Sequence, residues 1–379
     1  MHILLAVHRF PPTGQGGTEL YTLHLAQGLA RRGHRVDVLT YAPGPSWEIA
    51  PQEEEVDGIP VCRLSFSLDA ATPGPTNNPV REEYDNQRVA AFLRERFRQQ
   101  RPDLLHATHL GYLSTSLLAV AHELDIPTVV TLTDFWAICP TGLLTRSDGS
   151  LCAGPDSLGA CMRCYAHMGP RGKRYAAISR WIPDTLWQVG ATLAGEIGPG
   201  RWVRAAQNRT AVIRDRLLQA DALLCPGRFQ RDMLIRNGYP AERLRHAPHG
   251  IAHPNKLRRK TPVAEGPTLR LGYIGPLAPH KGAHLPLEAW AKLEKPPDIT
   301  LAYWGALPDA QEQKGYASAL LARLREAPGI THRGTYPNEA IREVLEEIDI
   351  LTVPSLCYEN TPTVIYEALA SGTPVLASD

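Results

Sequence analysis

The sequence has no excess of charge of one sign and no long apolar run. Its 379 residues carry 40 Lys and Arg against 39 Asp and Glu, so nothing in the bulk charge favours nucleic acid as a partner. No apolar stretch approaches the roughly 20 residues of a membrane-spanning helix. Residues 1–7 lack a basic segment before a strand-sized apolar run and so do not resemble a signal peptide. These absences favour a cytoplasmic protein.

Cysteine is scarce as well, with seven residues, which argues against a disulfide scaffold. Four of the seven nevertheless fall in one segment, at Cys139, Cys152, Cys161 and Cys164. Four thiols in one loop suit a structural zinc site. Because the first two are irregularly spaced, reduced free thiols remain the alternative.

The chain does contain alternating strand and helix patterns, which predict parallel sheets. A helix is expected at 19–32, and strands are expected at 3–7, 36–39, 104–107, 128–132, 222–224 and 269–274. The length allows two domains, each with its own core. The predicted fold class is α/β, with two doubly wound, Rossmann-like domains facing each other across a cleft and ligands at the carboxyl ends of the strands.

Composition suggests where these domains begin and end. Residues 1–250 form the first, with an insertion at about 140–216 that breaks the alternation and is rich in Trp and Arg. Residues 251–268, which contain three prolines and a basic run, are the predicted linker, and 269–379 form the second domain. Because the chain ends directly after a strand at 375–377 that we predict to be buried, we expect the second domain to be incomplete.

The most informative segment lies near the end of the chain. Thr361 is predicted to cap a helix that begins at Pro362 and ends at Gly372. Glu359 precedes this helix, and Glu367 lies about a turn inside it. The free backbone N–H groups between them suit a diphosphate, and the carboxylates suit sugar and ribose hydroxyls. This pattern predicts a nucleotide-sugar site.

A glycine loop at 275–282 follows the first strand of the second domain. Gly275 would let the backbone approach a ligand, and Lys281 would place a flexible positive charge on phosphate. A solvated loop lysine is the ordinary alternative, but the two glutamates favour a role in binding. The next helix is expected to present one common face formed by Leu285, Ala289, Trp290 and Leu293.

Together these residues resemble the retaining glycosyltransferases of family 4, which have the GT-B fold. The matching segments are Gly14-Gln-Gly16-Gly17-Thr-Glu, Arg31-Arg-Gly33-His-Arg-Val-Asp-Val, Thr131-Leu-Thr-Asp134-Phe-Trp, Pro248-His-Gly250-Ile, Gly275 to Gly282, and Val353-Pro-Ser355 through Glu367. The resemblance implies transfer of a sugar from a nucleotide-diphosphate sugar with retained configuration. It implies no metal or other cofactor for catalysis.

The resemblance also implies donor-side roles. Lys281 would bind the diphosphate, Glu359 would contact the transferred sugar, and both are catalytic candidates. Glu367 would bind the ribose. Further donor-binding residues would be Gly16, Gly17, Gly275, Asn360, Thr361, Thr363 and Val364. Where many members have an arginine, this chain has Pro276, and Arg333 is the candidate to assist instead.

On the acceptor side, His106-Ala-Thr-His109 follows a strand end, where the family often has histidines near the reacting sugar. His109 is therefore a catalytic and acceptor-side candidate, and His106 and Asp134 are acceptor-side candidates. Thr133 stands where the family commonly has a histidine. A structural or solvated histidine is the ordinary alternative for each.

The resulting prediction is a glycosyltransferase that acts on a hydroxyl of a glycan or lipid-linked acceptor. The Trp- and Arg-rich insertion also suggests a peripheral contact, which would place the protein at the inner face of the membrane. Two alternatives remain: a nucleotide-sugar epimerase of similar architecture, and a sugar-nucleotide-binding protein that does not catalyse.

Overall fold

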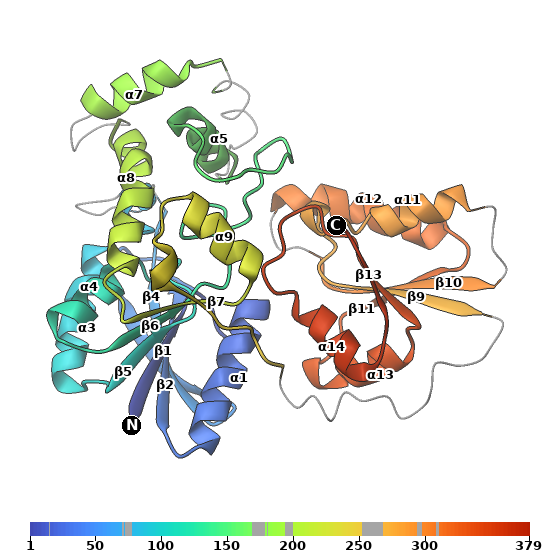
Figure 1. Ribbon diagram of the computed structural model, residues 1–379, viewed down its shortest axis with the longest axis horizontal. Coiled ribbons are helices and arrows are strands. Elements are labelled where there is room, and N and C mark those ends of the chain that lie inside the picture. The colour runs from blue at the N-terminus through green and yellow to red at the C-terminus, as the bar shows by residue number, and fades with distance from the viewer. Residues whose placement is uncertain are drawn as a thin grey trace. The chain divides into compact units, whose positions relative to one another are not determined.

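The computed structural model describes residues 1–14, 16–69, 72, 78–168, 179, 181–193, 200–251, 268–293, 298–307 and 311–379. The chain forms two compact units, Met1–His249 and Gly250–Asp379. Each unit contains one sheet with helices packed against it (Figure 1). None of the helices within the described ranges is long and apolar enough to cross a membrane.

The first unit has an eight-stranded sheet in the order β3-β4-β2-β1-β5-β6-β7-β8. Neighbouring strands are parallel except for the β3–β4 hairpin. The strands are β1 (His2–Val7), β2 (Arg35–Pro43), β3 (Ala50–Val56), β4 (Ile59–Phe66), β5 (Leu104–Ala107), β6 (Thr128–Thr131), β7 (Ala222–Cys225) and β8 (Leu244–His246). All five strands predicted for this unit are present, and the hairpin and β8 are additional.

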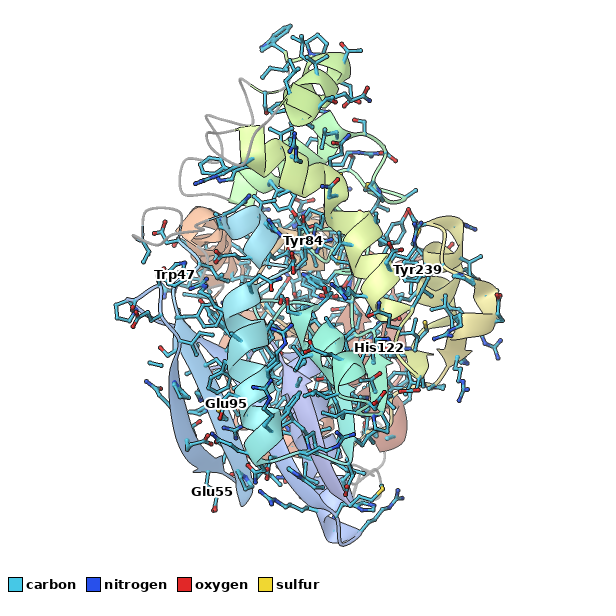
Figure 2. The ribbon with its side chains drawn as sticks, turned by 90° about the vertical axis from the view of Figure 1, so that its left-hand side faces the viewer. Trp47, Glu55, Tyr84, Glu95, His122 and Tyr239 are labelled. Atoms are coloured by element: carbon cyan, nitrogen blue, oxygen red, sulfur yellow. The ribbon has the colours of Figure 1, made fainter. Side chains whose placement is uncertain are left out.

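Helices cover this sheet on both sides. They are α1 (Gly17–Arg31), α2 (Pro79–Glu82), α3 (Gln87–Gln99), α4 (Ser116–Glu123), α5 (Leu158–Met168), α7 (Asp184–Leu193), α8 (Gly200–Leu217) and α9 (Arg228–Arg236), with a 3-10 turn at Ala241–Arg243. On α1, Leu23 and Ala26 lie three residues apart and pack onto the apolar residues of β1 and β2. Figure 2 shows α3 and α4 over one face of the sheet, with Glu95 and His122 as markers.

The second unit has a five-stranded parallel sheet in the order β11-β10-β9-β12-β13. Its elements are β9 (Leu269–Ile274), α11 (Leu285–Lys292), β10 (Ile299–Trp304), α12 (Gln311–Glu326), β11 (Ile330–Gly334), α13 (Ile341–Glu346), β12 (Ile350–Val353), α14 (Thr363–Ser371) and β13 (Val375–Ala377), with 3-10 turns at Pro279–Lys281 and Asn338–Ala340. The first strand lies in the middle and the chain winds outward in both directions. This confirms the predicted doubly wound α/β class.

Three local predictions were wrong. Helix α14 begins at Thr363 with Pro362 at the cap position, one residue later than expected, because Pro362 keeps an extended conformation (φ −70°, ψ 104°). Strand β13 is not buried: it lies at the edge of the sheet, and Leu376 is 63% exposed. On α11 the buried side chains are Leu287 and Trp290, because that face of the helix packs on the core, while Ala289 and Leu293 point outward.

Other predictions hold or fall outside the described residues. Gly372 ends α14 in the left-handed conformation (φ 82°), as predicted. Most of the predicted linker, 252–267, lies outside the part of the chain that the structure describes.

Candidate functional site

The loops after β9 and β12 bring Lys281 and Glu359 together, although 78 positions separate them. The Lys281 ammonium donates to Glu359 Oε1 over 2.7 Å, and Ser355 Oγ donates to the same oxygen over 2.5 Å. The two loops meet because β9 and β12 are neighbours and parallel. The side chains of Lys281 and Glu359 are 28% and 24% exposed, so both charged groups remain accessible to a ligand.

Glycine makes the close contact between these loops possible. Gly282 has φ 62°, and a Cβ there would lie 1.8 Å from the carbonyl oxygen of Pro354. Any other residue would therefore push Lys281 away from the β12 loop. Gly275 also has a positive φ (155°), and its carbonyl oxygen lies 1.8 Å from where a Cβ on Gly305 would be. The predicted glycine loop is thus a point of close backbone approach.

The amino end of α14 follows Glu359 directly. Thr363 and Val364 form the first turn of this nine-residue helix, and no side chain caps it. Backbone N–H groups in a first turn lack partners within the helix. Thr361 Oγ1 is buried and finds no hydrogen-bond partner among the described residues. This end of the helix therefore presents donors beside the Lys281–Glu359 pair.

Glu367 lies within α14, away from the ion pair. Burial raises the pKa of its carboxyl group, and the described residues offer it no ion-pair partner. Tyr336, in the loop after β11, is its neighbour: burial and then the charge of Glu367 raise the pKa of the phenol. A half-buried carboxylate without a cation is available to accept hydrogen bonds from a ligand.

Arg333 does not join the Lys281–Glu359 pair. It lies on β11, and its guanidinium is 3.5 Å from the carboxylate of Glu347. Both side chains are about half exposed (54% and 53%), so this is a surface ion pair. Its ion-pair partner is thus Glu347 rather than Glu359, and the diphosphate role suggested for Arg333 stays a prediction.

In the first unit, His109 and Asp134 form a second polar cluster. His109 Nε2 lies 3.0 Å from Asp134 Oδ2, and the Gly111 N–H donates to His109 Nδ1 over 3.0 Å. An acceptor at Nδ1 requires the proton on Nε2, so the imidazole donates to Asp134. Burial lowers the pKa of His109, but Asp134 together with the charges of Glu19 and Glu83 outweighs burial, and the pKa is raised.

Two residues not predicted from the sequence complete this cluster. The ring of His8 lies 4.1 Å from that of His109 between centroids, and its Nε2 is 3.4 Å from Glu19 Oε1. Burial raises the pKa of Glu19, which is 7% exposed. His8 follows β1 and His109 follows its neighbour β5. The position of His8 immediately after a predicted strand was the available signal for its place in the cluster.

Gly16 and Gly17 differ in their surroundings. A Cβ on Gly16 would lie 2.6 Å from Glu19 Oε2, whereas a Cβ on Gly17 would meet nothing within 4 Å. The Glu19 carboxylate therefore lies against the amino end of α1, which begins at Gly17. Gly17 leaves open space where a ligand can approach the helix.

His106 does not belong to this cluster. It lies within β5, is 9% exposed, and its Nε2 is 2.8 Å from Thr131 Oγ1. Burial lowers its pKa to about 4, so it is neutral. The acceptor-side role suggested for His106 is not supported, because its ring is buried against Thr131 of β6, three positions before His109.

A buried network connects the cluster to the insertion. The backbone N–H of Trp136 donates to Asp134 Oδ1 over 2.8 Å, and its indole N–H donates to Glu83. Arg209, from α8, contacts both carboxylate oxygens of Glu83 at 2.9 Å and the carbonyl oxygen of Trp136 at 2.8 Å. Arg209 is 2% exposed. No local pattern marked it in the sequence, because arginine in a helix is normally solvated.

The four clustered cysteines are free thiols. Burial raises the pKa of Cys161 to about 12 and also raises those of Cys152 and Cys164, so all three are protonated. Cys152 donates to the carbonyl oxygen of Gly154 over 2.8 Å, and Cys139 Sγ lies 3.1 Å from Thr141 Oγ1. Within the described residues, no three His, Cys, Asp or Glu side chains are placed to hold a metal ion. The charges of Cys139, Cys152 and Cys164 all raise the pKa of Cys161, so the four thiols lie near one another, and the structural zinc site stays a prediction.

Two family models together match most of the chain. Residues 16–250 match the glycosyl transferase 4-like domain, and residues 268–379 match the glycosyl transferases group 1. The chain belongs to the glycosyl transferase 4-like family. It is a glycosyltransferase of the GT-B type, and the match favours neither the epimerase nor the non-catalytic alternative.

Individual relatives of this glycosyltransferase are distant. It is 31% identical to the amylovoran biosynthesis glycosyltransferase AmsK of Erwinia amylovora, over 43% of this chain and 41% of that protein. It is 24% identical to glycogen synthase of Mycobacterium tuberculosis, over 100% of this chain and 78% of that protein. The alignment thus spans less than half the length of AmsK.

Solved structures show the same fold. Sucrose-phosphate synthase from Thermosynechococcus elongatus is similar with a TM-score of 0.61 and 17% identity, over 99% of this chain and 80% of that one. Anabaena HepE in complex with UDP and glucose is similar with a TM-score of 0.55 and 16% identity, over 99% of this chain and 80% of that one. At such identities the likeness establishes the GT-B fold alone.

Proposed function

We propose that this glycosyltransferase moves a sugar, with retained anomeric configuration, from a nucleoside-diphosphate sugar to a hydroxyl of a glycan or lipid-linked acceptor. The Lys281–Glu359 pair beside the uncapped amino end of α14 carries this proposal. A cation, a carboxylate and free N–H groups at one sheet edge are the groups that a phosphorylated sugar needs. Anabaena HepE, which shares the fold, is in complex with UDP and glucose.

Donor binding would begin with the diphosphate. Its charge would draw the Lys281 ammonium away from Glu359, while the N–H groups of Thr363 and Val364 and the dipole of α14 hold the phosphate oxygens. The freed Glu359 carboxylate would then accept a hydrogen bond from a hydroxyl of the sugar. Glu367 would accept hydrogen bonds from the ribose. Asn360 and Thr361, between the two glutamates, would contact the sugar and phosphates.

The transfer step would need no covalent intermediate on the protein. The acceptor oxygen bonds to the anomeric carbon as the bond from that carbon to the leaving phosphate breaks, on the same face. The acceptor proton passes to a leaving phosphate oxygen. Lys281 and the amides of α14 stabilise the charge that accumulates there, which is usually the largest catalytic contribution in such sites. In this scheme His109, oriented by Asp134, donates or accepts a hydrogen bond at the acceptor side.

Replacement of Lys281 tests the proposal. A thermal-shift screen of nucleotide sugars would first identify the donor that stabilises the wild-type chain. With that donor, Lys281→Ala should lose the shift and lower kcat/KM by about 100-fold or more, because the leaving phosphate loses its cation. Lys292→Ala, an exposed lysine at the end of α11, is the matched control and should behave as wild type.

Wild-type transfer by Lys281→Ala would refute the donor assignment. A donor that is converted without any acceptor would instead point to an epimerase. Product analysis by NMR would show whether the anomeric configuration is retained, and inversion would overturn that part of the proposal.

A further inference from the structure

Helix α7 of the insertion exposes an apolar face. Leu186, Val189 and Leu193 are spaced by three and four residues and so lie on one side of the helix. They are among the most exposed large apolar side chains of the described residues: Leu186 is 59% exposed, Val189 50% and Leu193 80%. Trp181, just before the helix, is 76% exposed. We name Leu186, Val189 and Leu193 the α7 face. Single exposed leucines are ordinary, but this concentration within one short helix is not.

The opposite side of α7 is held in place. Asp184 Oδ1 accepts the Gly159 N–H of α5 over 2.7 Å, and the Trp187 ring lies against Gly159, where a Cβ would meet it at 2.8 Å. At the other end, Arg204 of α8 donates to the carbonyl oxygens of Ala191 and Thr192 over 3.1 and 3.2 Å. These contacts fix which side of α7 faces outward. The α7 face is therefore a stable feature of the surface.

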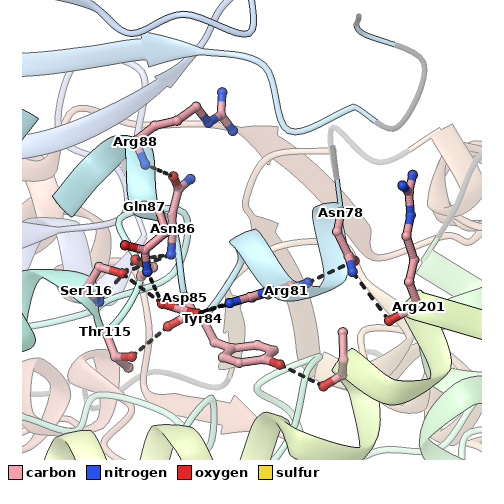
Figure 3. Close-up of polar contacts among 12 residues, drawn as sticks. Asn78, Arg81, Tyr84, Asp85, Asn86, Gln87, Arg88, Thr115, Ser116 and Arg201 are labelled. Atoms are coloured by element: carbon pink, nitrogen blue, oxygen red, sulfur yellow. Dashed lines mark hydrogen bonds and ion pairs between the residues drawn. The ribbon is translucent and has the colours of Figure 1, made fainter. Parts of the chain in front are cut away.

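Helix α8 anchors this assembly to the first unit. Asn78 Nδ2 donates to the Arg201 carbonyl oxygen over 3.4 Å, and Tyr84 donates to that of Ala205 over 3.0 Å (Figure 3). The buried Arg209–Glu83 pair is a third attachment on the same helix. Helix α7 lies at the outer end of α8, away from the sheet (Figure 1). Helix α7 therefore projects from the surface of the first unit.

The net charge of the insertion indicates which kind of partner the α7 face would bind. Residues 140–216 carry 11 Lys and Arg against 5 Asp and Glu, a net charge of +6, whereas the other residues carry 29 against 34, a net charge of −5. In the three helices of the insertion alone, six arginines stand against two aspartates. Arg209 is buried in its pair with Glu83, but Arg204 contacts α7 directly and Arg201 lies one turn from it on α8. Positive charge thus adjoins the outward apolar face and complements an anionic lipid surface.

We infer that the α7 face docks this protein on an anionic membrane surface, with the helix lying in the interface and its leucines entering the acyl boundary. A helix of ten residues is too short to span the bilayer and suited to lie on it. The arginines at the start of α8, Arg201 and Arg204, would lie at the level of the lipid phosphates. This inference does not depend on the proposed sugar transfer.

Vesicle flotation of the full chain, without donor or acceptor, tests the inference. One vesicle set is phosphatidylcholine alone, and the other contains roughly a third phosphatidylglycerol. We expect the chain to bind the second set only, and less at about 0.5 M salt than at about 0.05 M. Leu186→Ser/Leu193→Ser should bind at least about tenfold more weakly, since two apolar side chains no longer leave water. Leu293→Ser/Leu307→Ser, at exposed leucines of the second unit, is the matched control.

Several outcomes would overturn the inference. They are no binding of the wild-type chain to either vesicle set, equal binding to both, or equal loss in the control variant. Light scattering gives a further such outcome. If the wild-type chain is a dimer and Leu186→Ser/Leu193→Ser is a monomer, a second copy of the chain covers the α7 face. Unchanged melting temperatures for both variants would confirm that folding is not the cause of lost binding.

Discussion

At the scale of single residues, the two glutamates of the donor side have different surroundings. Glu359 is paired with Lys281 and Ser355, which orient its carboxylate. Glu367 has no such partner, and burial raises the pKa of its carboxyl group. The chain therefore retains an unfavourable carboxylate at Glu367, which is typical of groups that serve a ligand rather than stability.

This difference predicts a pH-dependent effect of Glu367→Gln. The pKa of Glu367 is higher in the folded state than in the unfolded state. Its contribution to the free energy of unfolding is therefore fully present below the unfolded-state pKa and is lost as pH rises through the folded-state pKa. Glutamine stays neutral, so the variant should melt about 1–3 °C higher than wild type near pH 7.5 and match it near pH 4. Donor-induced stabilisation should be lost. Glu347→Gln, at an exposed site, is the control in the same melting series; equal gains in both variants would contradict the argument.

At the scale of elements, helix α8 connects the insertion to the interior of the first unit. Arg209 reaches from α8 to Glu83, 126 positions earlier, and Glu83 holds the Trp136 indole. Trp136 in turn donates to Asp134, the partner of His109. Helix α8, which packs against α7, therefore also supports the acceptor-side cluster.

Arg209→Met should consequently be severely destabilising. Removal of one partner of a buried ion pair leaves an uncompensated charge, at a cost of about 3–5 kcal/mol in the free energy of unfolding. Glu83→Gln added to this variant should recover part of the loss, because the orphaned carboxylate is gone. Arg214→Met on the same helix, 36% exposed, should cost no more than about 0.5 kcal/mol. Urea unfolding measures the free energy of unfolding of all three variants. Similar losses of that free energy in Arg209→Met and Arg214→Met would show that the network is not stabilising.

At the scale of the whole molecule, the groups proposed for donor binding lie in the second unit and the α7 face lies in the first. The near-zero net charge of the chain conceals a local difference, because the net positive charge of the insertion offsets the net negative charge of the other residues. The bulk charge gave no support for nucleic acid as a partner, whereas the local excess favours an anionic surface.

The two activities should therefore be separable. Leu186→Ser/Leu193→Ser should keep the full nucleotide-sugar thermal shift, and Lys281→Ala should keep full binding to anionic vesicles. Both variants are measured in both assays from the same preparations. Loss of both properties in either variant would indicate that one variant perturbs the whole fold or that the two sites are coupled.

Several features were already determined by the sequence. The order of strands and helices follows from local apolar periodicity, and Gly275, Gly282 and Gly372 mark backbone conformations that side chains oppose. The donor-side residues from Glu359 to Glu367 lie on one short segment, so a local pattern was sufficient to single them out.

Only the tertiary structure decided which distant groups meet. The pairing of Lys281 with Glu359, of His8 with His109, and of Arg209 with Glu83 depends on strand order and helix packing, which no local pattern encodes. The same reason explains the errors: whether a strand such as β13 or a ring such as that of His106 is buried depends on its neighbours in the sheet. Periodicity specifies conformation, but burial and charge pairing are properties of the assembled chain.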